Sequence, residues 1–237
     1  MSLENRVAVV TGATGGLGRV VARRLGDEGA RLALVSSDSG RLGAFGRELN
    51  LPAERWLASA VDLTSPVGAR AAAEAALARF GRIDILLHLV GGWTGGKMVA
   101  QTPIEHIALM LQQHLWTTVH TVQAFAPHLV ANGWGRIIAV SSPAATRPAA
   151  KGAAYAAGKA AQEALLLALA QELAGTGVTA NMLVVQAIDV EHRRESERTA
   201  ETAKWTTPEE IASAIVYLCS GAAGVVNGAH IPLHGPP

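Results

Sequence analysis

Thr11-Gly12-Ala13-Thr14-Gly15-Gly16-Leu17-Gly18 is the stretch that decides the fold of this chain. It follows a short apolar run, Arg6–Thr11, which predicts a buried strand, and it opens an Ala/Leu/Arg-rich stretch, which predicts a helix. In this context Gly12 permits a tight turn, Gly16 allows the backbone to approach a pyrophosphate, and Gly18 allows helix and strand to pack closely. The anion then lies at the positive end of the helix. The stretch therefore predicts an α/β nucleotide-binding fold.

The rest of the chain continues this alternation of short aliphatic runs and longer helical stretches. The expected strands are Arg6–Thr11, Arg31–Ser36, Trp56–Val61, Ile83–Val90, Gly135–Ser141, Val178–Val185 and Ala229–Leu233. The expected helices are Leu17–Glu28, Gly40–Leu49, Pro66–Phe80, Pro103–Asn132, Lys151–Gly175 and Pro208–Cys219. Such alternation is typical of a parallel sheet covered by helices on both faces. We expect a single doubly wound, Rossmann-type α/β domain over residues 1–237, with a seven-stranded parallel sheet.

Composition argues against several classes of partner. The chain has 20 basic and 19 acidic residues, so neither a nucleic-acid surface nor a charged membrane-binding face is expected. No apolar run reaches the roughly 18 residues that a membrane span requires. The single cysteine, Cys219, excludes an intramolecular disulfide and fits a reducing compartment. We expect a cytoplasmic protein with no metal site, since the histidines show no metal-ligand clustering.

A second cluster, Tyr155-Ala156-Ala157-Gly158-Lys159, carries the chemistry, with Ser142 thirteen residues upstream. Tyrosine and lysine at i and i+4 lie on one helix face, with Cβ atoms about 5–6 Å apart. A nearby ammonium favours phenolate over phenol, so Lys159 is expected to lower the pKa of Tyr155 from its ordinary value of about 10. Tyr155 is thus a candidate general acid or base.

Together the glycine turn and the Ser…Tyr-x-x-x-Lys set resemble the short-chain dehydrogenase/reductase family over nearly the whole chain. The resemblance implies hydride transfer between NAD(P)(H) and a carbonyl or secondary alcohol, with a ketone or 3-oxoacyl thioester as the expected substrate. It implies that Ser142 polarises the carbonyl, Tyr155 transfers the proton, and Lys159 holds the ribose hydroxyls. It places the coenzyme contacts at Gly12, Thr14, Gly16, Leu17, Gly18, Ser36, Ser37, Asp62, Leu63, Gly91, Tyr155, Lys159 and Ile188. The alternative is a degenerate member that binds nucleotide or only assembles, without turnover.

Several positions depart from the family pattern. Where the family has Asn-Asn-Ala-Gly, this chain has His88-Leu89-Val90-Gly91, and Val185-Gln186 replaces the later Pro-Gly. Val190 stands where a threonine is usual. His88 is expected to be a buried histidine with its hydrogen bonds satisfied. His114 replaces the fourth catalytic residue, an asparagine that holds a relay water. Two hypotheses stay open: a working relay that titrates near the ordinary histidine pKa of about 6.5, or a merely hydrogen-bonded side chain.

The choice between NAD and NADP is weakly specified. The tip of the second strand carries Ser36 and Ser37, neither acidic nor basic. Asp38 has the spacing of a ribose-binding acid, although a helix N-cap is the favoured interpretation. Arg41 has the reach for a 2′-phosphate, so we expect NADP(H) or NAD(H) with a slight preference for NADP(H). Asp62 matches the family's adenine-binding position, and a helix cap is its alternative.

Residues 188–207 are expected to form a short lid over the substrate. Its charged residues suit a solvated helix with i,i+3 pairs such as Glu195–Arg198, whereas Arg193 or Arg194 contacting an anionic substrate is the alternative. Trp93, beside the pocket, is a candidate for stacking on a substrate. The family usually pairs its two long helices into tetramers, and we therefore expect a homotetramer, or at least a dimer.

Overall fold

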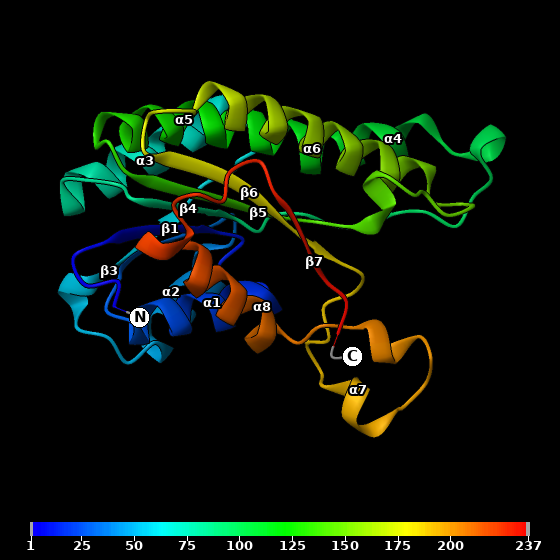
Figure 1. Ribbon diagram of the computed structural model, residues 1–237, viewed down its shortest axis with the longest axis horizontal. Coiled ribbons are helices and arrows are strands. Elements are labelled where there is room, and N and C mark those ends of the chain that lie inside the picture. Colours follow the sequence, from blue (N-terminus) through cyan, green and yellow to red (C-terminus); the bar gives the residue numbers. More distant parts are fainter. Residues whose placement is uncertain (1, 236–237) are drawn as a thin grey trace.

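A computed structural model describes residues 2–235. Seven parallel strands form one sheet in the order β3-β2-β1-β4-β5-β6-β7, seen edge-on through the middle of Figure 1. The strands are β1 (Val7–Thr11), β2 (Arg31–Ser36), β3 (Trp56–Ala60), β4 (Ile85–His88), β5 (Gly135–Ser141), β6 (Val178–Val185) and β7 (His230–Leu233). The expected fold class and strand number are confirmed, and strand ends differ from expectation by at most two residues.

Helices cover both faces of this sheet (Figure 1). One layer contains α1 (Gly16–Asp27), α2 (Ser39–Glu48) and α8 (Pro208–Leu218). The other contains α3 (Pro66–Phe80), α4 (Ile104–Leu111), α5 (Thr117–Ala131) and α6 (Ala153–Glu172). In the described part of the chain, no helix is both long enough and apolar enough to cross a membrane.

The apolar runs of the strands explain why two cores form. In β1, Ala8 and Val10 pack into one core, and Val7 and Val9 pack into the other. Side chains alternate between the faces of a strand, and a parallel sheet covered on both sides buries both sets. The helices therefore hold the sheet from both faces and leave the carboxyl ends of the strands for the site.

The long helix expected at Pro103–Asn132 differs from the structure in one respect. It is interrupted by a π-helical turn, Gln112–Trp116, in which the N–H of Thr117 donates to the carbonyl five residues earlier instead of four. The Thr117 hydroxyl compensates locally by donating to Gln113 O at 2.7 Å. Single π turns insert one extra residue and re-aim the side chains beside it, frequently at functional sites. Here the turn carries His114.

Candidate active site

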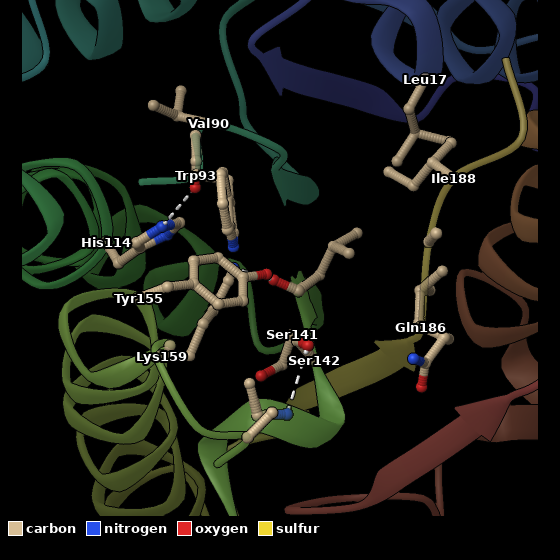
Figure 2. Close-up of a pocket in the computed structure, with 18 of the residues that line it drawn as sticks. Leu17, Val90, Trp93, His114, Ser141, Ser142, Tyr155, Lys159, Gln186 and Ile188 are labelled. Atoms are coloured by element: carbon tan, nitrogen blue, oxygen red, sulfur yellow. Dashed lines mark hydrogen bonds between the residues drawn. The ribbon is translucent and has the colours of Figure 1, made fainter. Parts of the chain in front are cut away.

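Two adjoining cavities lie along the carboxyl edge of the sheet. The larger has a volume of about 750 Å³ and is lined by Ser142, His114, Tyr155 and Lys159 among others. Figure 2 shows Tyr155 and Ser142 on one wall, with Leu17 and Ile188 on the opposite wall. The smaller cavity, of about 330 Å³, is lined by the glycine turn and the ends of β2 and β3. The 89–91 segment lines both, so one extended ligand would fit across them.

Ser142 and Tyr155 are brought together by β5 and α6. Ser142 is the residue after β5, and its Oγ accepts from Ala144 N at 3.3 Å as the cap of a short 3-10 turn. That bond uses an acceptor position, so the single hydroxyl hydrogen can be donated to Tyr155 or, in its place, to a substrate carbonyl. Tyr155 lies in the first turn of α6, where its hydroxyl interacts with the Ser142 side chain.

The expected lowering of the Tyr155 pKa by Lys159 is wrong for this structure. Burial raises the pKa of Tyr155 above its ordinary value and outweighs the lowering effect of the Ser142 hydroxyl. Lys159 is itself so buried that its pKa falls to about 7, partly offset by the charge of Glu163. Tyr155 is therefore a protonated phenol at neutral pH, in the state of a proton donor.

The support of Lys159 includes two residues that follow it on α6 and that sequence reasoning missed. Its Nζ donates to Val140 O at 2.7 Å and to Gln162 Oε1 at 3.0 Å. Glu163 is also buried; it accepts from Ser141 Oγ at 2.5 Å and lies 2.9 Å from His230 Nε2 of β7. Polar residues at positions 162 and 163 of an otherwise Ala/Leu-rich helix were the signal for both.

His114 lies against Tyr155, with ring centroids 5.4 Å apart in an edge-on arrangement. It is 1 % exposed, and burial together with the Lys159 charge lowers its pKa to about 4. The expected titration near 6.5 is therefore wrong. Its Nε2 lies 3.0 Å from Gly92 O, whereas Nδ1 has no protein partner. A neutral ring thus donates from Nε2 to that carbonyl and keeps Nδ1 as a buried, unused acceptor beside the cavity.

His88 is a buried histidine with both ring nitrogens satisfied. Its Nδ1 lies 3.1 Å from Thr11 Oγ1 and its Nε2 lies 3.3 Å from Thr117 Oγ1. Burial lowers its pKa to about 3, so the ring is neutral and has one N–H. Because the Thr117 hydrogen goes to Gln113 O, His88 donates from Nε2 and accepts at Nδ1. The imidazole of His88 on β4 thus joins β1 to the first residue of α5, directly after the π turn.

The glycine turn has the geometry that the sequence predicts at two of its three glycines. Gly12 has a φ of +66°, and a Cβ on Gly18 would lie 2.3 Å from Gly12 O, so neither position accepts a side chain without a shift. At Gly16 the space for a Cβ is taken by Val190 of the lid, 2.7 Å away. The segment expected to form the lid therefore packs against the glycine turn.

The smaller cavity contains the residues expected at the adenosine end. Thr14 Oγ1 bonds Ser36 Oγ at 2.9 Å, and Arg41 donates to Thr14 O at 3.0 Å. Ser37 also lines this cavity. Asp38 caps α2 by accepting from Arg41 N at 2.9 Å, which confirms the favoured interpretation as an N-cap.

Asp62 and Leu63 follow β3 and line the same cavity. The Asp62 carboxylate accepts from Thr64 N at 2.8 Å and from the Thr64 hydroxyl at 2.7 Å, and these bonds lower its pKa. Ser65, not Asp62, caps α3. The alternative interpretation of Asp62 as a helix cap is wrong, and its adenine role stays a prediction.

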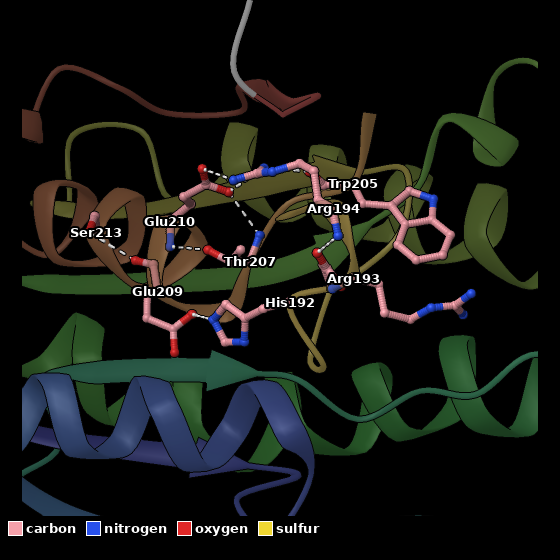
Figure 3. Close-up of polar contacts among 9 residues, drawn as sticks. His192, Arg193, Arg194, Trp205, Thr207, Glu209, Glu210 and Ser213 are labelled. Carbon is pink, nitrogen blue, oxygen red and sulfur yellow. Dashed lines mark hydrogen bonds and ion pairs between the residues drawn. The ribbon is translucent and has the colours of Figure 1, made fainter. Parts of the chain in front are cut away.

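Figure 3 shows how His192 and Arg194, in the segment expected to form the lid, are bonded to α8. Arg194 makes two bonds to the Glu210 carboxylate, at 2.9 and 2.7 Å, and His192 Nε2 lies 3.1 Å from Glu209. Arg193 pairs with Glu197 four residues later, instead of the expected i,i+3 pattern. The alternative in which either arginine awaits an anionic substrate has no support in the structure, because both guanidinium groups are engaged within the lid and its anchor.

The buried carboxylate of Asp189 holds the first turn of α7 (Arg193–Ser196) by accepting backbone hydrogen bonds within the same segment. It is 2 % exposed and accepts from the backbone N–H groups of Arg193 and Arg194 at 2.8 and 2.9 Å. A bridge between Ile188 and Thr206 closes the base of the lid. Sequence reasoning missed Asp189, because it stands four residues before α7 and outside the N-cap position, which His192 occupies.

The family model for short chain dehydrogenases matches residues 6–201. The chain belongs to this family. It is 30 % identical to the 2,3-dihydroxy-2,3-dihydro-p-cumate dehydrogenase of Pseudomonas putida over 99 % of this chain and 95 % of the relative. Its structure is similar to that of the 3-ketoacyl-(acyl-carrier-protein) reductase of Brucella melitensis complexed with NADH, with a TM-score of 0.87, 27 % identity and coverage of 98 % of each chain.

A third similar protein is the NADPH-bound short chain oxidoreductase of Pseudomonas aeruginosa PAO1, described as containing an atypical catalytic center. It has a TM-score of 0.87 and 29 % identity over 98 % of this chain and 96 % of that one. As a member of this family, the present chain is an NAD(P)-dependent oxidoreductase. Among residues 2–235 no group of three or more His, Cys, Asp or Glu side chains is arranged to hold a metal ion.

Proposed function

We propose that this protein interconverts a ketone and a secondary alcohol, with a cyclic or 3-oxoacyl carbonyl compound as substrate. The observation that carries the proposal is the gathering of Ser142, Tyr155 and Lys159 around one cavity that adjoins a second cavity at the glycine turn. A nicotinamide coenzyme, when bound, supplies the hydride for reduction or accepts it in oxidation. Both kinds of substrate are represented among the similar proteins by their names.

Each side chain has one task in this proposal. Ser142 donates its hydroxyl hydrogen to the substrate oxygen and polarises the carbonyl. Tyr155, kept as a phenol by burial, transfers its proton to that oxygen as the hydride reaches carbon. The Lys159 ammonium then stabilises the phenolate that remains. We propose that His114 Nδ1, which has no protein partner, accepts from a relay water through which Tyr155 regains its proton.

The residues of the smaller cavity support NADP(H) over NAD(H). No carboxylate terminates β2, where an acid would accept from a ribose 2′-hydroxyl and repel a 2′-phosphate. Ser36, Ser37 and Arg41 line the cavity there, and the Asp38 carboxylate is committed to the cap of α2. The Arg41 guanidinium, which donates to Thr14 O with one nitrogen, has further donors for a phosphate.

We further propose a homotetramer built on helix pairing. The outer face of α6 exposes a row of small residues, Ala157, Ala160, Ala164 and Ala168. Ile104 and Leu109 on α4 and Trp116 in the π turn are also exposed. Exposed apolar helix faces of this kind favour association with an identical copy. A monomeric mass in light scattering at micromolar concentration would exclude it.

A coenzyme titration followed by a substrate panel tests the function. NADPH and NADH fluorescence should report binding, with NADPH the tighter, and turnover should follow with cyclic ketones or 3-oxoacyl thioesters. Because Trp93 is 68 % exposed at the mouth of the larger cavity, Trp93→Ala should raise KM for a cyclic ketone more than for a linear thioester. Binding of coenzyme without turnover on any member of the panel would favour the degenerate alternative.

A further inference from the structure

A line of buried hydrogen bonds joins Lys159 to the π turn. Lys159 Nζ donates to Gln162 Oε1 at 3.0 Å, Gln162 Nε2 donates to Thr118 Oγ1 at 3.0 Å, and the Thr118 hydroxyl donates to His114 O at 2.5 Å. Gln162 and Thr118 are each 1 % exposed, and Lys159 is 5 % exposed. The line therefore connects α6 to the altered turn without reaching solvent.

The direction of this line is fixed at both ends. Reversing the Gln162 amide would place its Nε2 hydrogens against the Lys159 ammonium, which has only donors. It would also place Oε1 against Thr118 Oγ1, whose single hydrogen is already donated to His114 O. Because a buried amide left without hydrogen-bond partners is destabilising, one orientation holds. Because the line ends on a backbone carbonyl, it fixes positions and does not carry protons.

Two of the three Lys159 hydrogens are thereby assigned. One goes to Val140 O at 2.7 Å and one to Gln162 Oε1. The tetrahedral geometry of an ammonium then sets the direction of the third, and Lys159 lines the larger cavity. We propose that Gln162 is a positioning residue for Lys159: with Thr118 it ties the ammonium to the π turn and directs its remaining N–H into the coenzyme cavity. This inference rests on the proposed function of that cavity.

Packing between α6 and the π turn supports the same conclusion. A Cβ on Gly158 would lie 2.7 Å from Met110 O and 3.1 Å from His114 Cδ2. Immediately before Lys159, α6 therefore packs against the backbone at the end of α4 and against the His114 ring of the π turn. One turn later, Gln162 bonds Thr118 at the start of α5. Contacts on both sides of Lys159 thus link its position to that of the π turn.

Charged and titratable groups surround the ammonium from several elements. Tyr155 and Glu163 lie on α6, His114 lies in the π turn, and His88 lies on β4. Glu163 raises the pKa of Lys159, burial lowers it to about 7, and both histidines are neutral near that value. Gln162 contributes a neutral acceptor, which favours the ammonium form over the amine.

Direct titration of Lys159 tests the proposal without any activity. The chain has four lysines, Lys97, Lys151, Lys159 and Lys204, so lysine labelled with ¹³C at Cε gives four resolvable environments, with Lys159→Arg as the assignment variant. Gln162→Met, which preserves length and volume but removes the acceptor, should lower the Lys159 midpoint by about one pH unit, and Gln162→Glu should raise it by about one unit. The matched control Gln171→Met, at an exposed site on the same helix, should change nothing.

Coenzyme binding supplies the second readout. NADH is the probe, because it lacks a titrating 2′-phosphate. Gln162→Met should raise its dissociation constant about tenfold at pH 6.5, as expected for a lost bond to a charged group, and Thr118→Val should act in the same direction less strongly. Thr118→Ser, which keeps the hydroxyl, should restore wild-type binding.

The outcomes separate this inference from the proposed function. A purely structural Gln162 would lower the melting temperature in Gln162→Met but leave the Lys159 midpoint and NADH affinity unchanged, and that result overturns the proposal. If Gln162→Met does not fold, an unchanged midpoint in both Gln162→Glu and Thr118→Val overturns it equally. Absence of turnover on every carbonyl substrate would overturn the proposed function while the opposite midpoint shifts still support the positioning role.

Discussion

The nucleotide end and the reaction end of the two adjoining cavities are shaped by different means. At the nucleotide end the backbone conformation shapes the cavity. Gly12 has a left-handed φ, and a Cβ on Gly18 would lie 2.3 Å from the Gly12 carbonyl oxygen. At the reaction end, side-chain hydrogen bonds of His88 and His114 hold the elements around the cavity in place. Backbone geometry restricts residue identity to glycine, whereas a hydrogen-bond network can be rebuilt with other polar residues.

Removing the Tyr155 hydroxyl should abolish proton transfer at the reaction end without weakening coenzyme binding at the nucleotide end. Tyr155→Phe keeps the ring against His114 but deletes the proton donor, so kcat should fall at least about 10²-fold with NADPH affinity nearly unchanged. Steady-state kinetics and fluorescence titration measure the two separately. Tyr217→Phe, at the exposed second tyrosine on α8, is the control. Near-wild-type turnover in Tyr155→Phe would show that another group transfers the proton.

A methyl group at Gly18 should weaken coenzyme binding by distorting the glycine turn at the nucleotide end. The Cβ of Gly18→Ala would enter the Gly12 carbonyl and force α1 away from the turn, at a cost of about 1–3 kcal/mol typical of overpacking. Coenzyme affinity should fall together with the unfolding free energy. Gly221→Ala, where a Cβ meets nothing within 4 Å, should leave both unchanged. Equal stability of the two variants would mean that the turn is more adaptable than its contacts imply.

These two ends also differ in how much the sequence revealed. Hydrophobic periodicity predicts the seven strands and the strand–glycine turn–helix unit. Motif spacing identifies Ser142 and the Tyr155–Lys159 pair. The pKa directions of Tyr155 and His114 were not predictable, because they depend on burial that only the packed fold sets. The π turn likewise has no propensity signal, and Gln162 becomes meaningful only once α6 is seen to lie against that turn.

Lowering the pH should reduce the unfolding free energy, because the two histidines at the reaction end are buried in the neutral form. The pKa values of His88 and His114 fall to about 3 and about 4 in the fold, against about 6.5 unfolded. The unfolded chain therefore binds more protons below pH 6.5, and the unfolding free energy should fall by up to about 1.4 kcal/mol per pH unit for each histidine. His114→Asn should make the decline between pH 6.5 and 4 shallower in urea titrations.

The same variant tests the relay by activity. A neutral His114 produces no acid limb near pH 6.5, and its protonation should remove activity only near pH 4. His114→Asn should keep much of the turnover, because an amide can also hold a water, whereas His114→Ala should lose it. Equal turnover in the alanine and asparagine variants would mean that the imidazole only fills space. A wild type without turnover that gains it through His114→Asn would show that the natural protein has lost its relay.

Coenzyme choice is the smallest effect we expect, because the tip of β2 carries the uncharged Ser36 and Ser37, and Arg41 of α2 already donates to Thr14 O. Ser37→Arg adds a guanidinium that can bind a 2′-phosphate through two nitrogens, so the ratio of NADH to NADPH dissociation constants should rise, by about tenfold. Ser36→Asp should move the ratio the other way, since the carboxylate accepts from a 2′-hydroxyl and repels a phosphate. It also replaces the hydroxyl that bonds Thr14 at 2.9 Å, so Ser36→Ala is the control that separates this loss from the added charge.

Arg41→Gln should weaken NADPH binding more than NADH binding if the guanidinium holds the phosphate. Fluorescence titration with both coenzymes decides the matter: unchanged ratios in Ser37→Arg and Ser36→Asp would show that the 2′ position of the ribose lies away from the end of β2, and an unchanged ratio in Arg41→Gln would leave that arginine as a support for the Thr14 carbonyl alone.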